Sequence, residues 1–178
     1  MQLQFRIFFK AWISYDSEAK QDADWWSNST PAIKSYTGFD GALMIDTITG
    51  GFIQHMDLAL PQTFNKTYDW VLSFNVGEFI PKEFEETYID NVVKAATKGV
   101  AVSWGDQLNP EWTFPNEKSR SDVVEAFRKR GFEVDKAWSV TLALRTMLVW
   151  RRRGMLVFRR ATASEPEIQD KIRPNVEL

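Results

Sequence analysis

The segment "YDWVLSFNVGEFIP", residues 68–81, places polar groups directly after an apolar run. Trp70–Phe74 forms the apolar run, and Asn75, Gly77 and Glu78 follow it. A run of this kind predicts a strand that is buried on both faces, as in a parallel sheet covered by helices. Ligands of open α/β sheets bind outside the carboxyl ends of the strands. The polar end of this strand is therefore a candidate wall of a ligand crevice.

Cysteine is absent from the chain and histidine is rare. It contains no cysteine and only one histidine, His55, which excludes thiolate nucleophiles and thiolate metal sites and disfavours zinc sites built from imidazole. Neither a G-x-S-x-G hydrolase motif nor a Walker-type phosphate loop occurs. A lone histidine in "FIQHMDL" is more often a packed or surface strand residue than a base. We therefore expect no metal and identify no general base.

The charges of the chain nearly balance, with 22 basic and 24 acidic side chains and a formal net charge of −2. No overall field then attracts the chain to nucleic acid or to an anionic membrane. The arginines of "RKR" and "WRRRG" are typical of a solvated surface, and no apolar run approaches the roughly 18 residues of a membrane span. The start, "MQLQFRIFFKAWISY", lacks the cleavage site of a signal peptide. We expect a cytoplasmic protein without nucleic-acid or membrane partners.

Short apolar segments predict several strands. Residues 2–9, "QLQFRIFF", alternate polar and apolar side chains as a half-buried strand does. Two further strands are expected at about 34–40 and 52–57. Alternatively, 43–48 and 52–58 form a hairpin around "TGG".

The clearest helix follows Pro81, begins with acidic residues and is closed by Gly99. The next β run, "VAVSW", completes a strand, helix and strand in parallel with a right-handed crossover. A second helix is expected over "SDVVEAFRKRG", opened by Ser121 and closed by Gly131. A strand "FEVDKAW", a helical "TLALRTML" and a closing strand "GMLVFRR" follow. This alternation of β and α elements predicts an α/β protein.

Taken together, these segments resemble the seven-stranded class I S-adenosyl-L-methionine-dependent methyltransferases, especially the small-molecule branch called methyltransferase-like or type 11. The resemblance rests on "TGFDGA", "HMDLALP" and "YDWVLSFNVGEFIP" as the ends of strands two to four, on "KGVAVSW" as strand five, and on "RKRGFEVD" and "GMLVFRR" as the last helix and closing strands. It covers about residues 36–160 and implies a Rossmann-like sheet, mostly parallel with an antiparallel last strand. Residues 1–35 are then an atypical N-terminal segment, and residues 161–178 are expected to be a disordered tail.

The resemblance also implies cofactor contacts at the ends of three strands, made by Asp40, Gly41, Met56, Asp57, Leu58, Asn75 and Val76. Asp40 matches the acid that accepts hydrogen bonds from the ribose diol. Asp57 matches the position that usually holds the adenine amino group, with Met56 and Leu58 beside the ring. Without the resemblance, each aspartate is more often a turn or cap carboxylate.

The chain departs from the family pattern at its N-terminal part. The family's first strand ends in a glycine-rich loop, often G-x-G-x-G, whereas no two glycines of this chain are separated by a single residue. Relatives also usually carry an acid at the position of Asn75 and a histidine at that of Phe79. We expect residues 2–9 to fill the slot of the first strand, because its loss would leave the second and fourth strands with unpaired, buried edges.

Two functions are consistent with these observations. The first, favoured by "FDG" and "MDL", is an S-adenosyl-L-methionine-dependent methyltransferase-like enzyme that acts on a small molecule. The second, favoured by the missing glycine loop, is a non-catalytic or truncated relative that serves as an interaction module. The sequence names neither the methyl acceptor nor the oligomeric state.

Overall fold

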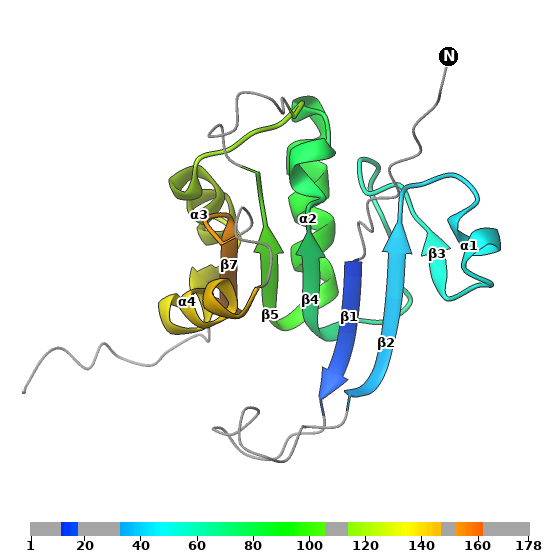
Figure 1. Cartoon of the computed structure of the whole chain (residues 1–178), viewed down its shortest axis with the longest axis horizontal. Helices are drawn as coiled ribbons and strands as arrows, with labels where there is room; N and C mark the ends of the chain where they lie inside the picture. The colour runs from blue at the N-terminus through cyan, green and yellow to red at the C-terminus, as the bar shows by residue number, and fades with distance from the viewer. Residues whose placement is uncertain (1–11, 18–32, 106–113, 147–151, 162–178) are drawn as a thin grey trace, which may run out of the picture.

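The computed structural model describes residues 12–17, 33–105, 114–146 and 152–161. Within these residues, seven strands form one sheet in the order β3-β2-β1-β4-β5-β7-β6 (Figure 1). The strands are β1 (Trp12–Ser17), β2 (Ile33–Asp40), β3 (Ile53–His55), β4 (Tyr68–Phe74), β5 (Ala96–Ser103), β6 (Phe132–Val134) and β7 (Met155–Arg160). The helices are α1 (Ile45–Ile48), α2 (Glu85–Ala95), α3 (Arg120–Arg128) and α4 (Lys136–Arg145), with 3₁₀ turns η1 (Gly77–Phe79) and η2 (Lys82–Phe84).

Two strands run against the others. β2 pairs in parallel with β3, and β4 with β5. β1 is antiparallel to both β2 and β4, and β7 is antiparallel to both β5 and β6. In Figure 1 the β1 arrow points opposite to those of β2, β4 and β5. The expected α/β fold with an antiparallel last strand is confirmed, and the reversed β1 makes the sheet mixed.

The central slot of the sheet is filled by Trp12–Ser17. Trp12 lies opposite Phe39 of β2 and opposite Ser73 of β4 in the backbone register. The prediction that residues 2–9 fill this slot is therefore wrong, and those residues lie outside the described part of the chain. Because β1 is reversed, its first residue, and not its last, lies at the edge where β2 and β4 end.

The unit β4-α2-β5 agrees with the predicted strand, helix and strand in parallel. A stripe of α2, formed by Tyr88, Ile89, Val92 and Ala95, is buried in the main core. The helix ends at Ala95 and β5 begins at the next residue, so Gly99 does not close the helix as expected. Gly99 lies inside β5, where a Cβ would collide with the ring of Trp70 and the carbonyl of Phe158.

The main core lies where α2 and α3 pack on the central strands. Val71, Val100 and Val102 of the sheet are fully buried there. The rings of Phe127 on α3 and Phe158 on β7 stack with 4.4 Å between their centroids. Apolar burial on this scale is the main force that holds helices on a sheet.

Three local expectations are corrected. The helix α1 separates β2 from β3, so the alternative hairpin around "TGG" does not form. Ser119, and not Ser121, caps α3, because its Oγ accepts the backbone N–H of Asp122 at 3.2 Å. Asp135 ends the predicted strand "FEVDKAW" after Val134, since its carboxylate accepts the N–H of Trp138 at 2.9 Å and caps α4.

α4 protects the edge of β7 that β6 leaves open. Val157 donates its N–H to Ser139 Oγ at 2.9 Å and accepts the N–H of Asp135 at 2.8 Å. These bonds satisfy backbone groups of β7 that would otherwise form an exposed edge.

The predicted tail begins at Ala161, which donates its N–H to the carbonyl of Gly131 at 2.8 Å. Residues 162–178 lie outside the described part of the chain, so their predicted disorder stays a prediction. Among the described residues, no helix is long and apolar enough to cross a membrane. The same residues contain no group of three or more His, Cys, Asp or Glu side chains placed to hold a metal ion.

Candidate functional site

The residues predicted to contact a cofactor lie at one edge of the sheet. Asp40 ends β2, Met56–Leu58 follow β3, and Asn75 and Val76 follow β4. They form two walls, because β1 lies between β2 and β4. Neighbouring strands are about 4.8 Å apart, so the two walls are about 10 Å apart.

Asp40 is the best placed of these residues to contact a ligand. It is 9% exposed, and its Oδ1 accepts the N–H of Ala42 at 2.8 Å. No described residue donates a hydrogen bond to its Oδ2. The carbonyl of Asp40 accepts the N–H of Met56 at 2.9 Å, which joins the ends of β2 and β3. Gly41 is exposed, and a Cβ there would lie 3.7 Å from the carbonyl oxygen of Met56.

Asp57 lies in an exposed turn after β3. Its Oδ1 accepts the N–H of Ala59 at 2.9 Å, as expected of a turn carboxylate. Its carbonyl accepts Gln62 Nε2 at 2.6 Å. Leu58 is buried in the core and Met56 is half-buried against it. The turn therefore presents the Asp57 carboxylate to solvent while its neighbours anchor it.

Asn91 of α2 holds this turn in place. Its side chain is fully buried, and Nδ2 donates to the carbonyls of Leu58 at 3.0 Å and Leu60 at 2.8 Å. Its Oδ1 accepts the N–H of Gln62 at 2.9 Å. Sequence reasoning missed Asn91, although an amide beside the apolar stripe of a helix is a signal of a buried polar contact.

The wall after β4 is rigid and polar. Asn75 has a φ of 55° and donates its backbone N–H to Ser103 Oγ at 2.9 Å. Its Nδ2 donates to Glu78 Oε1 at 2.8 Å, and Glu78 is fully buried. Val76 is buried in the core, and Gly77 lies against the ring of Trp104. These contacts fix the loop by side chains from β5 and from η1.

A buried pair of hydroxyl groups lies below this wall. Tyr88 OH and Ser73 Oγ are 2.8 Å apart, and both side chains are fully buried. Burial raises the pKa of Tyr88 far above its usual value, the hydrogen bond with Ser73 opposes that rise, and the charge of Glu78 adds to it. Tyr88 therefore stays protonated at ordinary pH and is no candidate for a base.

The side chains at this edge determine which chemical groups it can bind. Carboxylates at the ends of β2 and β3 are acceptors for hydroxyl and amino groups. The amino end of the reversed β1 takes the place where the family's first strand would pass into its glycine loop. His55 is exposed at the end of β3, opposite Asp40 in the register. The edge can thus bind and orient polar groups.

Comparisons with known proteins concern the fold. No family model matches the chain, and no curated protein matches it. It is similar to magnesium protoporphyrin IX methyltransferase from Synechocystis PCC 6803 with bound SAH, at 17% identity and a TM-score of 0.45, over 61% of this chain and 51% of that one. For the same enzyme with bound SAM, the identity is 17% and the TM-score is 0.44, over 61% of this chain and 45% of that one. For the pyocyanin biosynthetic protein PhzM, the identity is 14% and the TM-score is 0.40, over 66% of this chain and 38% of that one.

The chain thus spans about half, or less, of the length of these structures. With TM-scores below 0.5, the likenesses carry no argument about a ligand or a reaction. The order and directions of the strands describe the fold directly. The chain has an α/β fold with a mixed sheet that resembles the Rossmann-like methyltransferase fold.

Proposed function

We propose that the chain is a methyltransferase-like protein that binds S-adenosyl-L-methionine or S-adenosylhomocysteine weakly and transfers methyl groups to a small molecule slowly or not at all. The observation that carries this proposal is the placement of Asp40 at the end of β2. Its carboxylate is nearly buried, one oxygen is held by the N–H of Ala42, and the other makes no hydrogen bond with a described residue.

In this proposal Asp40 accepts hydrogen bonds from the ribose diol and Asp57 accepts one from the adenine amino group. Met56, which is half-buried, packs beside the ring, and Asn75 and Val76 line the opposite wall. The cofactor, when bound, supplies an electrophilic methyl group, and the chain's own task is to position it. Each charge-assisted hydrogen bond contributes about 1.5–3 kcal/mol, so two such contacts support only weak binding.

The reversed β1 favours a second candidate, a non-catalytic relative that serves as an interaction module. The amino end of β1 lies at the binding edge. β1 therefore does not end there, and it does not lead into a glycine loop whose backbone N–H groups face the cofactor. The methionine end of the cofactor then lacks the glycine-rich loop that holds it in the family. No general base for the methyl acceptor is identified among the described residues.

Calorimetric titration of the purified chain with S-adenosylhomocysteine tests the proposal. We expect a dissociation constant in the high micromolar to millimolar range, equivalent to about 4–6 kcal/mol. Asp40→Asn keeps an oxygen for the N–H of Ala42 and removes the charge, so it should weaken binding about tenfold. Asp46→Asn, on the exposed helix α1, is the control for a change in net charge and should bind as the wild type does.

Two outcomes would decide against this assignment. Absence of binding at millimolar ligand would reject the cofactor and leave the non-catalytic candidate. Binding that neither Asp40→Asn nor Asp57→Asn changes would place the cofactor site elsewhere on the chain.

A further inference from the structure

A small hollow lies beyond the end of β5 and the start of β7. Its lining consists of Trp104, Lys118, Arg120, Val123, Arg153, Gly154 and Leu156. The floor is apolar, since Trp104, Val123 and Leu156 belong to the buried core. Three of the lining side chains are cationic and none is acidic. The hollow's volume of about 20 Å³ has room for one small group and not for a whole substrate.

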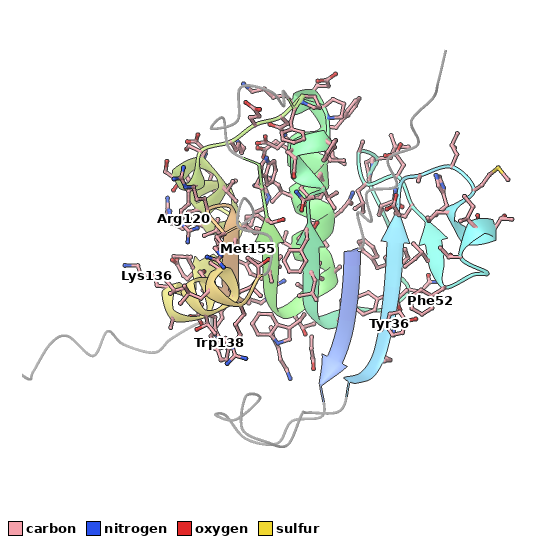
Figure 2. The ribbon with its side chains drawn as sticks, viewed as in Figure 1. Tyr36, Phe52, Arg120, Lys136, Trp138 and Met155 are labelled. Atoms are coloured by element: carbon pink, nitrogen blue, oxygen red, sulfur yellow. The ribbon has the colours of Figure 1, made fainter. Side chains whose placement is uncertain are left out.

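Arg120 is held in place at this hollow. Its Nη1 donates to the carbonyls of Arg153 at 3.0 Å and Met155 at 2.9 Å. Figure 2 labels Arg120 of α3 and Met155 of β7. These two bonds tie the start of α3 to the start of β7 and orient the guanidinium plane. Its Nε and Nη2 make no hydrogen bond with a described residue, so they remain as donors for a ligand. A guanidinium fork presented in this way matches carboxylate and phosphate oxygens.

The charges around the hollow leave a positive excess. Lys118 pairs with Glu85 through Nζ and Oε1 at 2.9 Å, and their side chains are only 19% and 8% exposed. Arg153 is exposed and makes no ion pair with a described residue. Asp122 accepts a hydrogen bond from Ser119 Oγ at 2.7 Å and does not line the hollow. Among the described residues, no acidic side chain forms an ion pair with Arg120 or Arg153.

We infer that this hollow is an anion subsite that holds a carboxylate or phosphate group of the small-molecule substrate. The inference rests on the proposed function and adds the substrate class, an anionic small molecule. The positive hollow and its apolar floor attract such a group and remove it partly from water, which strengthens the interaction.

The position of the hollow fits this role. Trp104 lines it and also lies against Gly77 in the loop after β4, so a single ring separates the hollow from the candidate cofactor edge. From β4 to β7 the sheet spans two strand spacings, or about 10 Å. The substrate would therefore carry its anionic group about 10 Å from the acceptor atom, a distance that a molecule with one or two rings bridges.

Titration with inorganic phosphate at constant ionic strength, followed by amide chemical shifts, tests the subsite without the cofactor. We expect saturable shifts at Lys118–Arg120 and Gly154. Arg153→Gln should weaken this binding about fivefold, because a single charge near the ligand is lost. Arg152→Gln removes the same charge from the neighbouring exposed residue, which does not line the hollow, and should change the affinity less than about twofold.

A parallel titration with acetate distinguishes a carboxylate from a phosphate group. If only one of the two anions binds, the subsite takes the group that this anion represents. Equal effects of Arg152→Gln and Arg153→Gln, or no saturable shift at tens of millimolar of either anion, would overturn the inference.

S-adenosylhomocysteine binding, measured on the same variants, separates the two proposals. Arg153→Gln should leave it unchanged. If the wild type binds S-adenosylhomocysteine but neither anion, the subsite alone is refuted. If it binds an anion but not S-adenosylhomocysteine, the proposed function and the hollow's role as a substrate subsite are refuted.

Discussion

Asn75 donates its side-chain amide to the fully buried carboxylate of Glu78, with 2.8 Å between Nδ2 and Oε1. Asn75 also has a φ of 55°, in the left-handed region that asparagine tolerates better than most residues with a side chain. One residue thus supplies both the shape of the turn after β4 and the partner of a buried acid.

Replacing Asn75 with aspartate should be strongly destabilising. The amide donor becomes a second carboxyl group beside Glu78, and two carboxylates at this distance repel each other. We expect a loss of about 2–4 kcal/mol in the free energy of unfolding near neutral pH. The loss should shrink as the pH falls towards about 4, because a protonated carboxyl group can donate again. Urea unfolding at both pH values measures this, and an equal loss at each would contradict the explanation.

Gly77 should not tolerate a side chain. A Cβ at this position would lie 2.6 Å from the ring of Trp104, which is 3% exposed and whose Nε1 donates to the carbonyl of Asn116 at 2.7 Å. Because the ring cannot move away freely, Gly77→Ala should cost about 1–3 kcal/mol of stability by overpacking. Gly41→Ala, with 3.7 Å to its nearest contact, is the control and should change stability by less than about 0.5 kcal/mol. Equal midpoints of thermal unfolding for the two variants would refute the prediction.

Asn91, which is distant along the chain from the turn at 57–62, should hold that turn in place. Asn91→Asp keeps an acceptor for the N–H of Gln62 but removes the donor that serves the carbonyls of Leu58 and Leu60. We expect faster amide hydrogen exchange in this turn and a stability loss of about 2–3 kcal/mol, because buried carbonyls lose their partners. Asn65→Asp, on the exposed surface, should change neither quantity. Unaltered exchange in the turn of Asn91→Asp would show that other contacts hold it.

Tyr88 should make stability fall at high pH. Burial raises the pKa of Tyr88 in the folded state, so the folded chain keeps a proton that the unfolded chain releases above about pH 10. The contribution of the protonated Tyr88 to the free energy of unfolding is complete below about pH 10 and is lost as the pH rises further. Tyr88→Phe should cost about 1 kcal/mol near neutral pH, since Ser73 loses its partner, and should lower the pH dependence above pH 10.

The control for this prediction is Tyr36→Phe, which removes a hydroxyl group from a side chain that is 41% exposed. Denaturant unfolding at neutral and alkaline pH compares the three proteins. If the free energies of unfolding of wild type and Tyr88→Phe change in parallel with pH, the prediction is refuted.

Local patterns were sufficient for the elements around the cofactor edge. The apolar run Trp70–Phe74 and the apolar stripe of α2 predicted β4, α2 and β5, because each signal lies within a few neighbouring residues. The place of Asp40 at the end of β2 agrees with the family resemblance of "TGFDGA", which singled this residue out. The signals for β4, α2 and β5 do not depend on what the rest of the chain does.

Contacts between distant residues could not be predicted in this way. The Arg120 guanidinium reaches the carbonyl of Arg153 across 33 positions, and Asn91 reaches Leu58 across the same separation. No periodic pattern within one segment encodes such a meeting. Only the docking of α2 and α3 on the sheet brings these groups together.

The sequence by itself determined the α/β class and the order of most strands and helices, since these follow from local periodicity and turn residues. The tertiary structure alone decided that Trp12–Ser17 fills the centre of the sheet and runs against β2 and β4. The alternation of side chains along a strand reads the same in either direction, so it carries no information about orientation. Orientation depends on hydrogen bonds to two neighbours, one of them more than 50 positions away along the chain, as Trp12 and Ser73 are.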